Sequence, residues 1–586
     1  MKSFFKNVLS TIVGMVLAVF VIILLFIGVL SISLSSINNE EEVKLKENSI
    51  LKINLSELSV VERTSENPFE SLNFSGEIPK TIALKQVLDN IEKAKKDERI
   101  KAIYINTSFV NAGISQIEEI RNKLLEFKQT GKHIIAYSEV YTQAAYYLSS
   151  VANKIYLNPR GVIEIKGLSA SIMFYKGLLD KLDIDVQIIR HGKFKGAVEP
   201  FVLDRMSTAN REQMQLLLNS FADNIMDSIA NQRGLTLAKV QQHANTLSLE
   251  NARSCIDYSY VDGLLYQDQL EDTLKALAGT EKLSIVTLSK YTYVKSNKKK
   301  VSRNKIAIIY ATGEINSGKG DEKSIGSETT AKAIKQATKD KNVKAIVLRI
   351  NSPGGSALAS DVIWRETILA KSKKPLVVSM GDYAASGGYY IACAADSIVA
   401  NPTTLTGSIG VFGMIPNLSR FYKNKLGITI DTVNTGKYAD MGVNRALSTF
   451  EKNKIQTSVK NIYTTFITHV GEGRNMSKTA VDEIGQGRVW TGYDAKEIGL
   501  IDTYGGLEKA IDIAAYLAKV EDYRIISLPK KKNPFEELSL KLSGEASISD
   551  LILSKFGFTT QITEPIEELL KGDKIQARVP FIMELK

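Results

Sequence analysis

The stretch "DERIKAIYIN", residues 97–106, occurs again 243 residues later as "DKNVKAIVLR", residues 340–349. Each version contains a short apolar run beside charged residues, which is typical of a buried strand. The same spacing relates two further pairs of dipeptides: Tyr146-Tyr147 with Tyr389-Tyr390, and Asn158-Pro159 with Asn401-Pro402. Self-similarity at a fixed spacing indicates that one domain occurs twice in the chain.

The similarity continues toward the end of each copy. "HGKFKGA", residues 191–197, matches "TGKYADM", residues 435–441, after one residue of slippage. The long segments that follow Ser207 and Ser448 also match each other and predict additional helices. The two copies are therefore expected to be joined near residues 290–304.

Within each copy, patterns typical of strands alternate with patterns typical of helices. "ISQIEEIRNKLLEFKQTG", residues 114–131, has apolar residues at helical spacing and ends at a glycine. It lies between the apolar run in residues 97–106 and "KHIIAYSEV", residues 132–140, which also indicates a strand. Strand–helix–strand alternation with short connections predicts right-handed crossovers in an α/β fold.

Composition limits the classes of function. The 586-residue chain has 44% hydrophobic and 24% charged residues, as expected for a globular protein. Its net charge is +11, but the lysines are scattered and the dense cluster at residues 295–305 resembles a solvated linker. We therefore expect an anionic membrane surface, and no nucleic acid, as the partner of this charge. Cys255 and Cys393 form no CxxC motif, and their pairing stays open.

The N-terminal segment predicts a membrane anchor. Residues 8–34 contain no charged side chain, and 23 to 27 helical residues would span roughly 35 to 40 Å. This apolar run is longer than that of a cleavable signal peptide. Lys2 and Lys6 precede it and residues 40–42 are all glutamate, so the N-terminus is expected in the cytoplasm and the body outside.

The two copies differ in residues that carry chemistry. Ser386 of the second copy corresponds to Gln143, and the glycine turn "NSPGG", residues 351–355, corresponds to "SFVNA". Conversely, Lys195 of the first copy corresponds to Ala439. One copy thus supplies a serine and a flexible turn, and the other supplies a lysine. This complementarity predicts one composite site per chain.

In this site we expect Ser386 to be the nucleophile and Lys195 its general base. A serine hydroxyl is a poor nucleophile until a neighbouring group accepts its proton. Lysine does so only when neutral, and burial lowers its pKa from about 10.4 toward neutrality. The hydroxyl of Ser408, which corresponds to Ile165 in the first copy, would hold the amine in place.

The developing oxyanion would need backbone N–H groups at close range. Gly354, Gly355 and Gly387 are the candidates, since glycine lets the main chain approach where a Cβ would collide.

Other interpretations of these residues remain open. The small residues around Ser386 are also typical of close helix packing. A Ser-His-Asp triad is the rival mechanism, and His191, four residues before Lys195, is its candidate base. Lys193 is matched by Lys437, so it follows the shared fold rather than the unique chemistry. The sequence contains no HExxH motif and no Walker-type phosphate loop, so neither a metal nor a cofactor is expected.

Five segments in order carry a resemblance to a known family: "GKFKGAVEPF", "NSPGG", "YAASGGYYIA", "TLTGSIGV" and "GRVWTGYDAKEIGLID". Together they resemble the long, two-repeat form of signal peptide peptidase A, also called protease IV. The resemblance extends from the anchor to about residue 520. It implies tandem crotonase- or Clp-protease-like repeats of ββα spiral type, with an N-terminal transmembrane helix and added helices.

The same resemblance implies a function. It assigns the nucleophile to Ser386, the base to Lys195 and the supporting hydroxyl to Ser408. It also implies a homotetramer over the outer leaflet of the cytoplasmic membrane that degrades cleaved signal peptides. The expected layout is a cytoplasmic N-terminus (1–7), an anchor (8–34), an N-terminal repeat (45–290), a linker (291–304), a C-terminal repeat (305–527) and an extension of uncertain role (528–586).

Two other classes of function stay open. The first is a non-catalytic, membrane-anchored scaffold or chaperone on the same fold, in which Ser386 and Lys195 would have no role in chemistry. The second is acyl-thioester chemistry, which crotonase-like folds also support. An exterior body on a membrane anchor suits the second class poorly.

Overall fold

The computed structural model describes residues 43–64, 80–295, 302–530 and 575–578, with scattered helical positions between residues 4 and 21. The predicted anchor at residues 8–34 lies largely outside these described residues. A search of the described part of the chain identifies no helix with the length and apolar character needed to span a bilayer.

The first repeat forms a parallel sheet of six strands among the described residues, in the order β8-β6-β5-β4-β1-β9. Apolar side chains on both faces of this sheet are buried, as expected where helices cover both faces. Its strands are β1 (Ser49–Ile53), β4 (Ile100–Ile105), β5 (His133–Tyr141), β6 (Lys154–Ile163), β8 (Gly263–Leu264) and β9 (Ile285–Thr287). Its helices include α2 (Leu84–Lys96), α3 (Ile114–Lys128), α4 (Gln143–Ser149), α5 (Lys176–Lys181), α6 (Glu199–Val202), α7 (Thr208–Arg233), α8 (Leu237–Thr246), α9 (Ala252–Asp257), α10 (Gln267–Ala278) and α11 (Leu288–Thr292).

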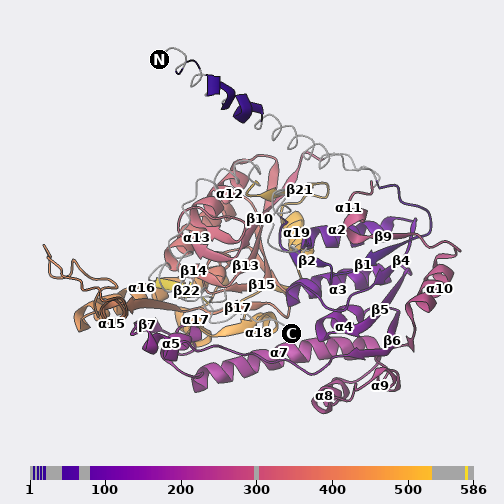
Figure 1. The fold of residues 1–586 in the computed structure, drawn as a ribbon, viewed down its shortest axis with the longest axis horizontal. Helices are drawn as coiled ribbons and strands as arrows, with labels where there is room; N and C mark the ends of the chain where they lie inside the picture. The colour runs from indigo at the N-terminus through magenta and orange to yellow at the C-terminus, as the bar shows by residue number, and fades with distance from the viewer. Residues whose placement is uncertain are drawn as a thin grey trace.

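The second repeat forms the corresponding sheet of eight strands, which is parallel except where β19 pairs with β17. Figure 1 shows the two repeats side by side, with α7 running beneath both. The strands of the second-repeat sheet are β10 (Lys305–Thr312), β13 (Val343–Ser352), β15 (Leu376–Ala385), β16 (Ser397–Ala400), β17 (Leu405–Gly407), β19 (Val489–Thr491), β20 (Thr503–Tyr504) and β21 (Arg524–Leu528). Its helices include α12 (Ser327–Lys339), α13 (Ala357–Lys371), α14 (Gly387–Ala392), α15 (Ser419–Leu426), α16 (Thr449–Arg474), α17 (Lys478–Ile484), α18 (Gly492–Glu497) and α19 (Leu507–Leu517).

A third sheet combines strands from both repeats and from the C-terminal extension, in the order β12-β11-β14-β22-β18-β7. β7 comes from the first repeat, whereas β22 comes from the extension, to which the sequence assigned no role. The strands are β7 (Asp185–His191), β11 (Glu314–Asn316), β12 (Ser324–Gly326), β14 (Gly354–Ser356), β18 (Val411–Asn417) and β22 (Ile575–Arg578). A separate pair, β2 (Leu58–Val61) and β3 (Lys80–Ala83), lies in the first repeat.

The two long helices begin where the sequence predicts. Ser207 and Ser448 each accept a hydrogen bond from a backbone N–H in the first turn of α7 and α16, respectively, which satisfies a donor that the helix leaves unpaired. On α7, Met214, Leu217 and Phe221 pack against residues of the second repeat. Through these contacts, α7 packs the first repeat against the part of the second repeat that contains Ser386.

Both cysteines are free and buried, so no disulfide joins the repeats. Cys255 lies in the core of the first repeat and Cys393 in that of the second. The pairing that the sequence left open therefore does not form, and each cysteine is a buried thiol in the core of its own repeat.

Candidate functional site

Lys195 and Ser386 meet in the interior of the protein. The distance between Nζ of Lys195 and Oγ of Ser386 is 2.7 Å, and both residues have 0% exposed surface. The two predicted partners from different repeats thus lie within hydrogen-bond distance of each other.

The backbone at Ser386 is strained. Ser386 lies between the end of β15 and the start of α14, with a φ of 56° and a ψ of −112°. A positive φ is costly for a residue with a Cβ and persists where the surroundings enforce it. Here the backbone N–H of Ser386 donates to the carbonyl of Gly407 at 2.7 Å. At this sharp strand-to-helix turn, the hydroxyl of Ser386 lies within hydrogen-bond distance of Nζ of Lys195.

Lys195 follows a strand of the first repeat, β7, which pairs with a strand of the second repeat, β18. β7 runs antiparallel to β18 over seven residue pairs, from Val411–His191 to Asn417–Asp185. Just beyond β7, the N–H of Phe194 donates to the carbonyl of Gln486 at 2.9 Å. These contacts fix the main chain immediately before Lys195.

Two glycines of the second repeat make room for the lysine. A Cβ on Gly487, whose φ is +80°, would lie 2.8 Å from the backbone nitrogen of Lys195, and one on Gly410 would lie 3.3 Å from Cδ of Lys195. The 2.8 Å contact is too close for a real Cβ, and the 3.3 Å contact is tight and would require the lysine to shift slightly. Gly487 and Gly410 therefore form the surface against which the lysine packs. Both lie in segments that carry the family resemblance, but neither was predicted from the sequence as a site residue.

The structure places Ser408 in contact with the amine of Lys195. Nζ of Lys195 donates to Oγ of Ser408 at 3.0 Å and to its carbonyl oxygen at 3.1 Å. Burial lowers the pKa of Lys195 well below its ordinary value, because an ammonium group loses its hydration there. A neutral amine with two N–H bonds directed at Ser408 has its lone pair left for the hydroxyl of Ser386.

The three candidate oxyanion glycines lie together. A Cβ on Gly354 would be 2.8 Å from the backbone nitrogen of Gly387, and one on Gly387 would be 3.2 Å from the backbone nitrogen of Gly355. The φ angles of Gly354 and Gly355 are +108° and +152°. The sequence predicted a turn here, but the glycine pair belongs to the short strand β14, beside the residue that follows Ser386.

The C-terminal strand β22 lies on these same glycines. It pairs antiparallel with β14, with Ala577 opposite Gly355, and antiparallel with β18, with Gln576 opposite Phe412. The carbonyl oxygen of Ala577 would lie 2.1 Å from a Cβ on Gly354 and 3.2 Å from one on Gly387. An extended segment of the chain itself therefore passes directly over the oxyanion glycines.

The rival residues have other surroundings. The ring of His191 lies 4.1 Å from that of Tyr463, centroid to centroid, and Lys193 is exposed. Ser352 and Ser356 accept backbone N–H groups at the turn and at the start of α13, respectively. Ser386 is thus paired with Lys195, while the two nearby serines have local structural contacts.

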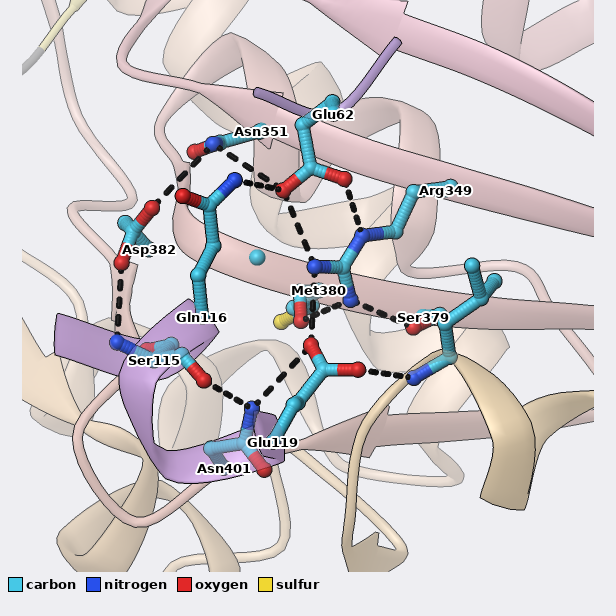
Figure 2. A network of polar contacts seen from close by, with 12 residues as sticks. Glu62, Ser115, Gln116, Glu119, Arg349, Asn351, Ser379, Met380, Asp382 and Asn401 are labelled. Atoms are coloured by element: carbon cyan, nitrogen blue, oxygen red, sulfur yellow. Dashed lines mark hydrogen bonds and ion pairs between the residues drawn. The ribbon is translucent and has the colours of Figure 1, made fainter. Parts of the chain in front are cut away.

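A buried ionic network joins the repeats one strand away from Ser386 (Figure 2). Arg349 on β13 contacts Glu62 through Nε at 2.7 Å and Glu119 on α3 through a terminal nitrogen at 2.8 Å. The arginine also donates to Oγ of Ser379 at 2.9 Å. Burial alone would lower the pKa of Arg349, but the two carboxylates raise it overall, so the guanidinium stays charged.

Asp382 extends this network along β15, the strand that leads to Ser386. Its carboxylate accepts the N–H of Ser115, at the start of α3, at 2.9 Å, and the amide of Asn351 at 3.3 Å. Burial raises the pKa of Asp382 to about 6. None of these side chains was predictable from the sequence as part of a network, because their contacts form only when the two repeats dock.

Both repeats match one protein family. Residues 126–281 and 368–521 match Peptidase family S49. The chain is 36% identical to Protease 4 of Salmonella typhi over 454 residues, covering 76% of this chain and 73% of the relative. It is 34% identical to a chloroplastic serine protease SPPA of Arabidopsis thaliana over 513 residues, which cover 86% of this chain and 75% of the relative.

Shorter relatives align with less of the chain. A putative signal peptide peptidase SppA of Enterococcus faecium is 35% identical over 271 residues, covering 44% of this chain and 77% of the relative. Among solved structures, the 1510-N membrane-bound stomatin-specific protease is 15% identical, covers 41% of this chain and 99% of that chain, and has a TM-score of 0.27. That score is too low to bear on the fold.

The family match falls in both halves of the chain, and the relatives are similar over most of their own length. The chain has an α/β fold with two repeats, it belongs to Peptidase family S49, and it is a serine peptidase.

Proposed function

We propose that the protein is a membrane-anchored endopeptidase in which Ser386 is the nucleophile and Lys195 the general base. Its substrates are apolar peptides, including signal peptides left after cleavage. The observation that carries this proposal is the 2.7 Å contact between a fully buried lysine amine and the serine hydroxyl. Burial supplies the neutral amine that the chemistry needs.

The reaction follows from these contacts. Oγ of Ser386 attacks the scissile carbonyl carbon while its proton moves to Nζ of Lys195. The resulting ammonium donates that proton to the departing peptide amine, which leaves an acyl ester on Ser386. Water then attacks the ester, again losing a proton to Lys195, and Ser386 is regenerated. Ser408 keeps the amine aligned in both halves of the cycle.

The backbone N–H of Gly387 and one from Gly354 or Gly355 stabilise the oxyanion. Donors fixed before the reaction stabilise charge that develops in the transition state without reorganising. The absence of a Cβ at these positions allows the substrate carbonyl to approach as closely as the carbonyl of Ala577 does.

The substrate binds as an extended strand between β14 and β18. β22 supports this mode, since it occupies that position and makes main-chain pairs on both sides. Main-chain pairing of this kind accepts many sequences, which suits an enzyme that degrades peptides of varied composition. Small residues fit beside the oxyanion glycines, where Ala577 is 1% exposed.

The location and assembly are part of the proposal. The uncharged residues 8–34, preceded by Lys2 and Lys6, support a single span with the N-terminus inside and the body outside. A relative's name, putative signal peptide peptidase, supports the substrate class. We further propose a homotetramer on the outer face of the cytoplasmic membrane, where released signal peptides accumulate.

The test uses the full-length protein in detergent with a short apolar peptide ester and with a synthetic signal peptide. Lys195→Ala should lower kcat by about 10²- to 10⁴-fold, and Ser386→Ala, which removes the nucleophile, should lower it by about 10⁶-fold. The matched control Lys193→Ala, only two residues from the base and exposed, should keep full activity. Activity that survives both dyad substitutions would exclude the mechanism.

The scaffold alternative makes a different prediction. A protein without catalytic function would cleave neither substrate, and membranes lacking it would contain the same amount of cleaved signal peptide. Accumulation of these peptides, restored to the normal level by the unmodified protein but not by Ser386→Ala, would support the proposed substrate.

A further inference from the structure

The strand β15 is irregular just before Ser386. β13 and β15 run parallel, with Ile350 opposite Met380 and then Ser352 opposite Ala384. Between these two pairs β13 advances by two residues and β15 by four, so part of β15 has no partner on β13. Extra residues of this kind bend a strand and change the direction of the side chains that follow. Because regular pairing resumes only two residues before Ser386, this bulge sets where the hydroxyl lies.

The side chain of Asn351 occupies the gap in the pairing. Its Oδ1 accepts the backbone N–H of Tyr383 at 3.1 Å, as a carbonyl of a regular ladder would. Its Nδ2 donates to the carboxylates of Asp382 at 3.3 Å and Glu62 at 3.4 Å, and Figure 2 shows the amide between these two groups. A Cβ on Gly381 would lie 3.0 Å from Cγ of Asn351, so a glycine at this position leaves room for the amide.

Asp382 connects the bulge to the first repeat. Its Oδ1 accepts the backbone N–H of Ser115, in the first turn of α3, at 2.9 Å. Gly113 is the N-cap residue of α3, and any Cβ there would overlap the carboxyl group of Asp382. A carboxylate at the start of a helix satisfies an unpaired donor and is stabilised by the helix dipole. Asp382 therefore caps a first-repeat helix whose own N-cap residue has no side chain.

The repeat without the nucleophile lacks this arrangement. At the offset of 243 residues, Asn351 corresponds to Ser108 and Asp382 to Glu139. Oγ of Ser108 lies 2.7 Å from Oγ of Ser138, and Glu139 is exposed. The shared fold thus forms without the amide–carboxylate pair. This pair occurs in the repeat that supplies the serine, which points to a role beyond folding.

Asn351 joins the two segments of main chain that lead into the site. It stands three residues before Gly354 on one segment, and its amide holds Tyr383, three residues before Ser386, on the other. Ser386 has a φ of 56°, and strained backbone persists only where the surroundings enforce it. The carbonyl of Gly407 supports Ser386 directly, and the amide of Asn351 supports the strand that leads to it.

We propose that Asn351 and Asp382 are positioning residues of the peptidase. The amide of Asn351 sets the register of β15 and thereby the placement of Ser386 against Lys195. The carboxylate of Asp382 maintains that register only while α3 of the first repeat is docked. Both residues act through the main chain of β15 and not on the substrate. This inference rests on the proposed function, since it takes Ser386 as the nucleophile.

The first test measures kcat and KM of the full-length enzyme with an apolar peptide ester, well below the thermal midpoint of each variant. Asn351→Ala releases the register, and a misplacement of about 1 Å costs roughly 10²-fold in rate, so kcat should fall by about that factor with little change in KM. The matched control Ser108→Ala alters the equivalent position of the other repeat and should keep the wild-type kcat. A purely structural role would lower the thermal midpoint of Asn351→Ala and leave kcat unchanged.

The second test exchanges the two side chains. Asn351→Asp keeps an acceptor for Tyr383 but places a third carboxyl group beside Asp382 and Glu62, so kcat should fall. Adding Asp382→Asn restores the contacts with donor and acceptor reversed: the new amide donates to the new carboxylate and still accepts the N–H of Ser115. The double variant should therefore recover part of the kcat that Asn351→Asp loses.

The third test acts from the first repeat. Gly113 has a φ of −68° and a ψ of 156°, which alanine adopts without strain, so Gly113→Ala chiefly displaces the carboxylate of Asp382. This variant should lower kcat although its position lies in the other repeat. In an Asp382→Ala background the carboxylate is already absent, so Gly113→Ala should lower kcat little further. Such non-additivity identifies two positions that act through one contact.

The outcomes separate this inference from the proposed function. A wild-type kcat in folded Asn351→Ala, an exchange that recovers none of the loss, or additive effects of Gly113→Ala and Asp382→Ala would overturn the inference, even where Ser386→Ala is inactive. Activity that survives Ser386→Ala would instead overturn the proposed function.

Discussion

Lys195 and Ser386 are separated by 191 residues of sequence, and a 2.7 Å contact joins their side chains inside the protein. A buried lysine has lost the hydration that keeps an exposed lysine charged. The lowered pKa of Lys195 therefore has consequences for both the rate and the stability of the enzyme.

The first prediction concerns the dependence of rate on pH. Because the base must be neutral, kcat/KM should rise as Lys195 loses its proton, with a midpoint well below the ordinary lysine value of about 10.4. The profile is measured with a peptide ester in the full-length enzyme. His191→Ala should leave the midpoint unchanged, and loss of the rising limb in that variant would instead assign the base to histidine.

The second prediction concerns stability. Between the lowered pKa of folded Lys195 and about 10.4, the unfolded chain binds one proton more than the folded chain, so stability rises with pH across this window. Lys195→Met removes that dependence. The thermal midpoint of this variant minus that of the wild type should therefore decrease from pH 7 to pH 10. Lys193→Met is the control and should show a constant difference, and a constant difference for Lys195→Met would contradict the burial argument.

The third prediction concerns Gly487, one of the two glycines against which Lys195 packs. In Gly487→Ala the new Cβ would lie 2.8 Å from the backbone nitrogen of Lys195, so the amine must move. A misplacement of about 1 Å costs roughly 10²-fold in rate, so kcat should fall by about that factor. Gly499→Ala has a similar φ, +77°, but its Cβ meets nothing within 4 Å. It should lose stability without a comparable loss of kcat, and equal losses in both variants would contradict the placement.

The fourth prediction concerns the C-terminal strand. If β22 occupies the position of the substrate, ending the chain at residue 574 should lower the KM for a peptide several-fold, because a tethered competitor is removed. A chain ending at residue 578 keeps the strand and is the matched control. An unchanged KM in the shorter chain, with its thermal midpoint preserved, would show that substrate binds elsewhere.

The fifth prediction concerns the ionic network between the repeats. Arg349→Met leaves Glu62 and Glu119 buried without their cation, so it should destabilise the protein by about 3–5 kcal/mol. Lys176→Met breaks an exposed pair with Asp180 and should leave stability nearly unchanged, because water and salt screen such a pair. Urea titrations of both variants measure the difference. Adding Glu62→Gln and Glu119→Gln to Arg349→Met should restore part of the loss, whereas a further loss would mean that the charges are not the cause.

Sequence comparison within the chain singled out Ser386, Lys195 and Ser408, which the fold brings into contact, because the two repeats retain different polar residues on one shared pattern. The helices after Ser207 and Ser448 were predictable for a local reason, since a serine cap precedes each helical pattern. These features depend on residues that are close in sequence or on matched positions.

Features that depend on docking could not be predicted in this way. Gly410 and Gly487 are ordinary glycines until β7 brings Lys195 onto them. Arg349 lies in an apolar strand pattern, and its partners Glu62 and Glu119 come from the other repeat. β22 is four residues in a tail of mixed composition, and its place is set by the open edges of β14 and β18.

In the proposed mechanism, the division of the reactive pair between the two repeats also governs when the enzyme can first act. During translation the amine of Lys195 is made long before the alcohol of Ser386, and the strand that positions this amine, β18, follows Ser386. A nascent chain therefore has no means of cutting its neighbours until most of its length has left the ribosome. In the proposed mechanism, peptidase activity therefore arises only after the second repeat has been synthesised and has folded against the first.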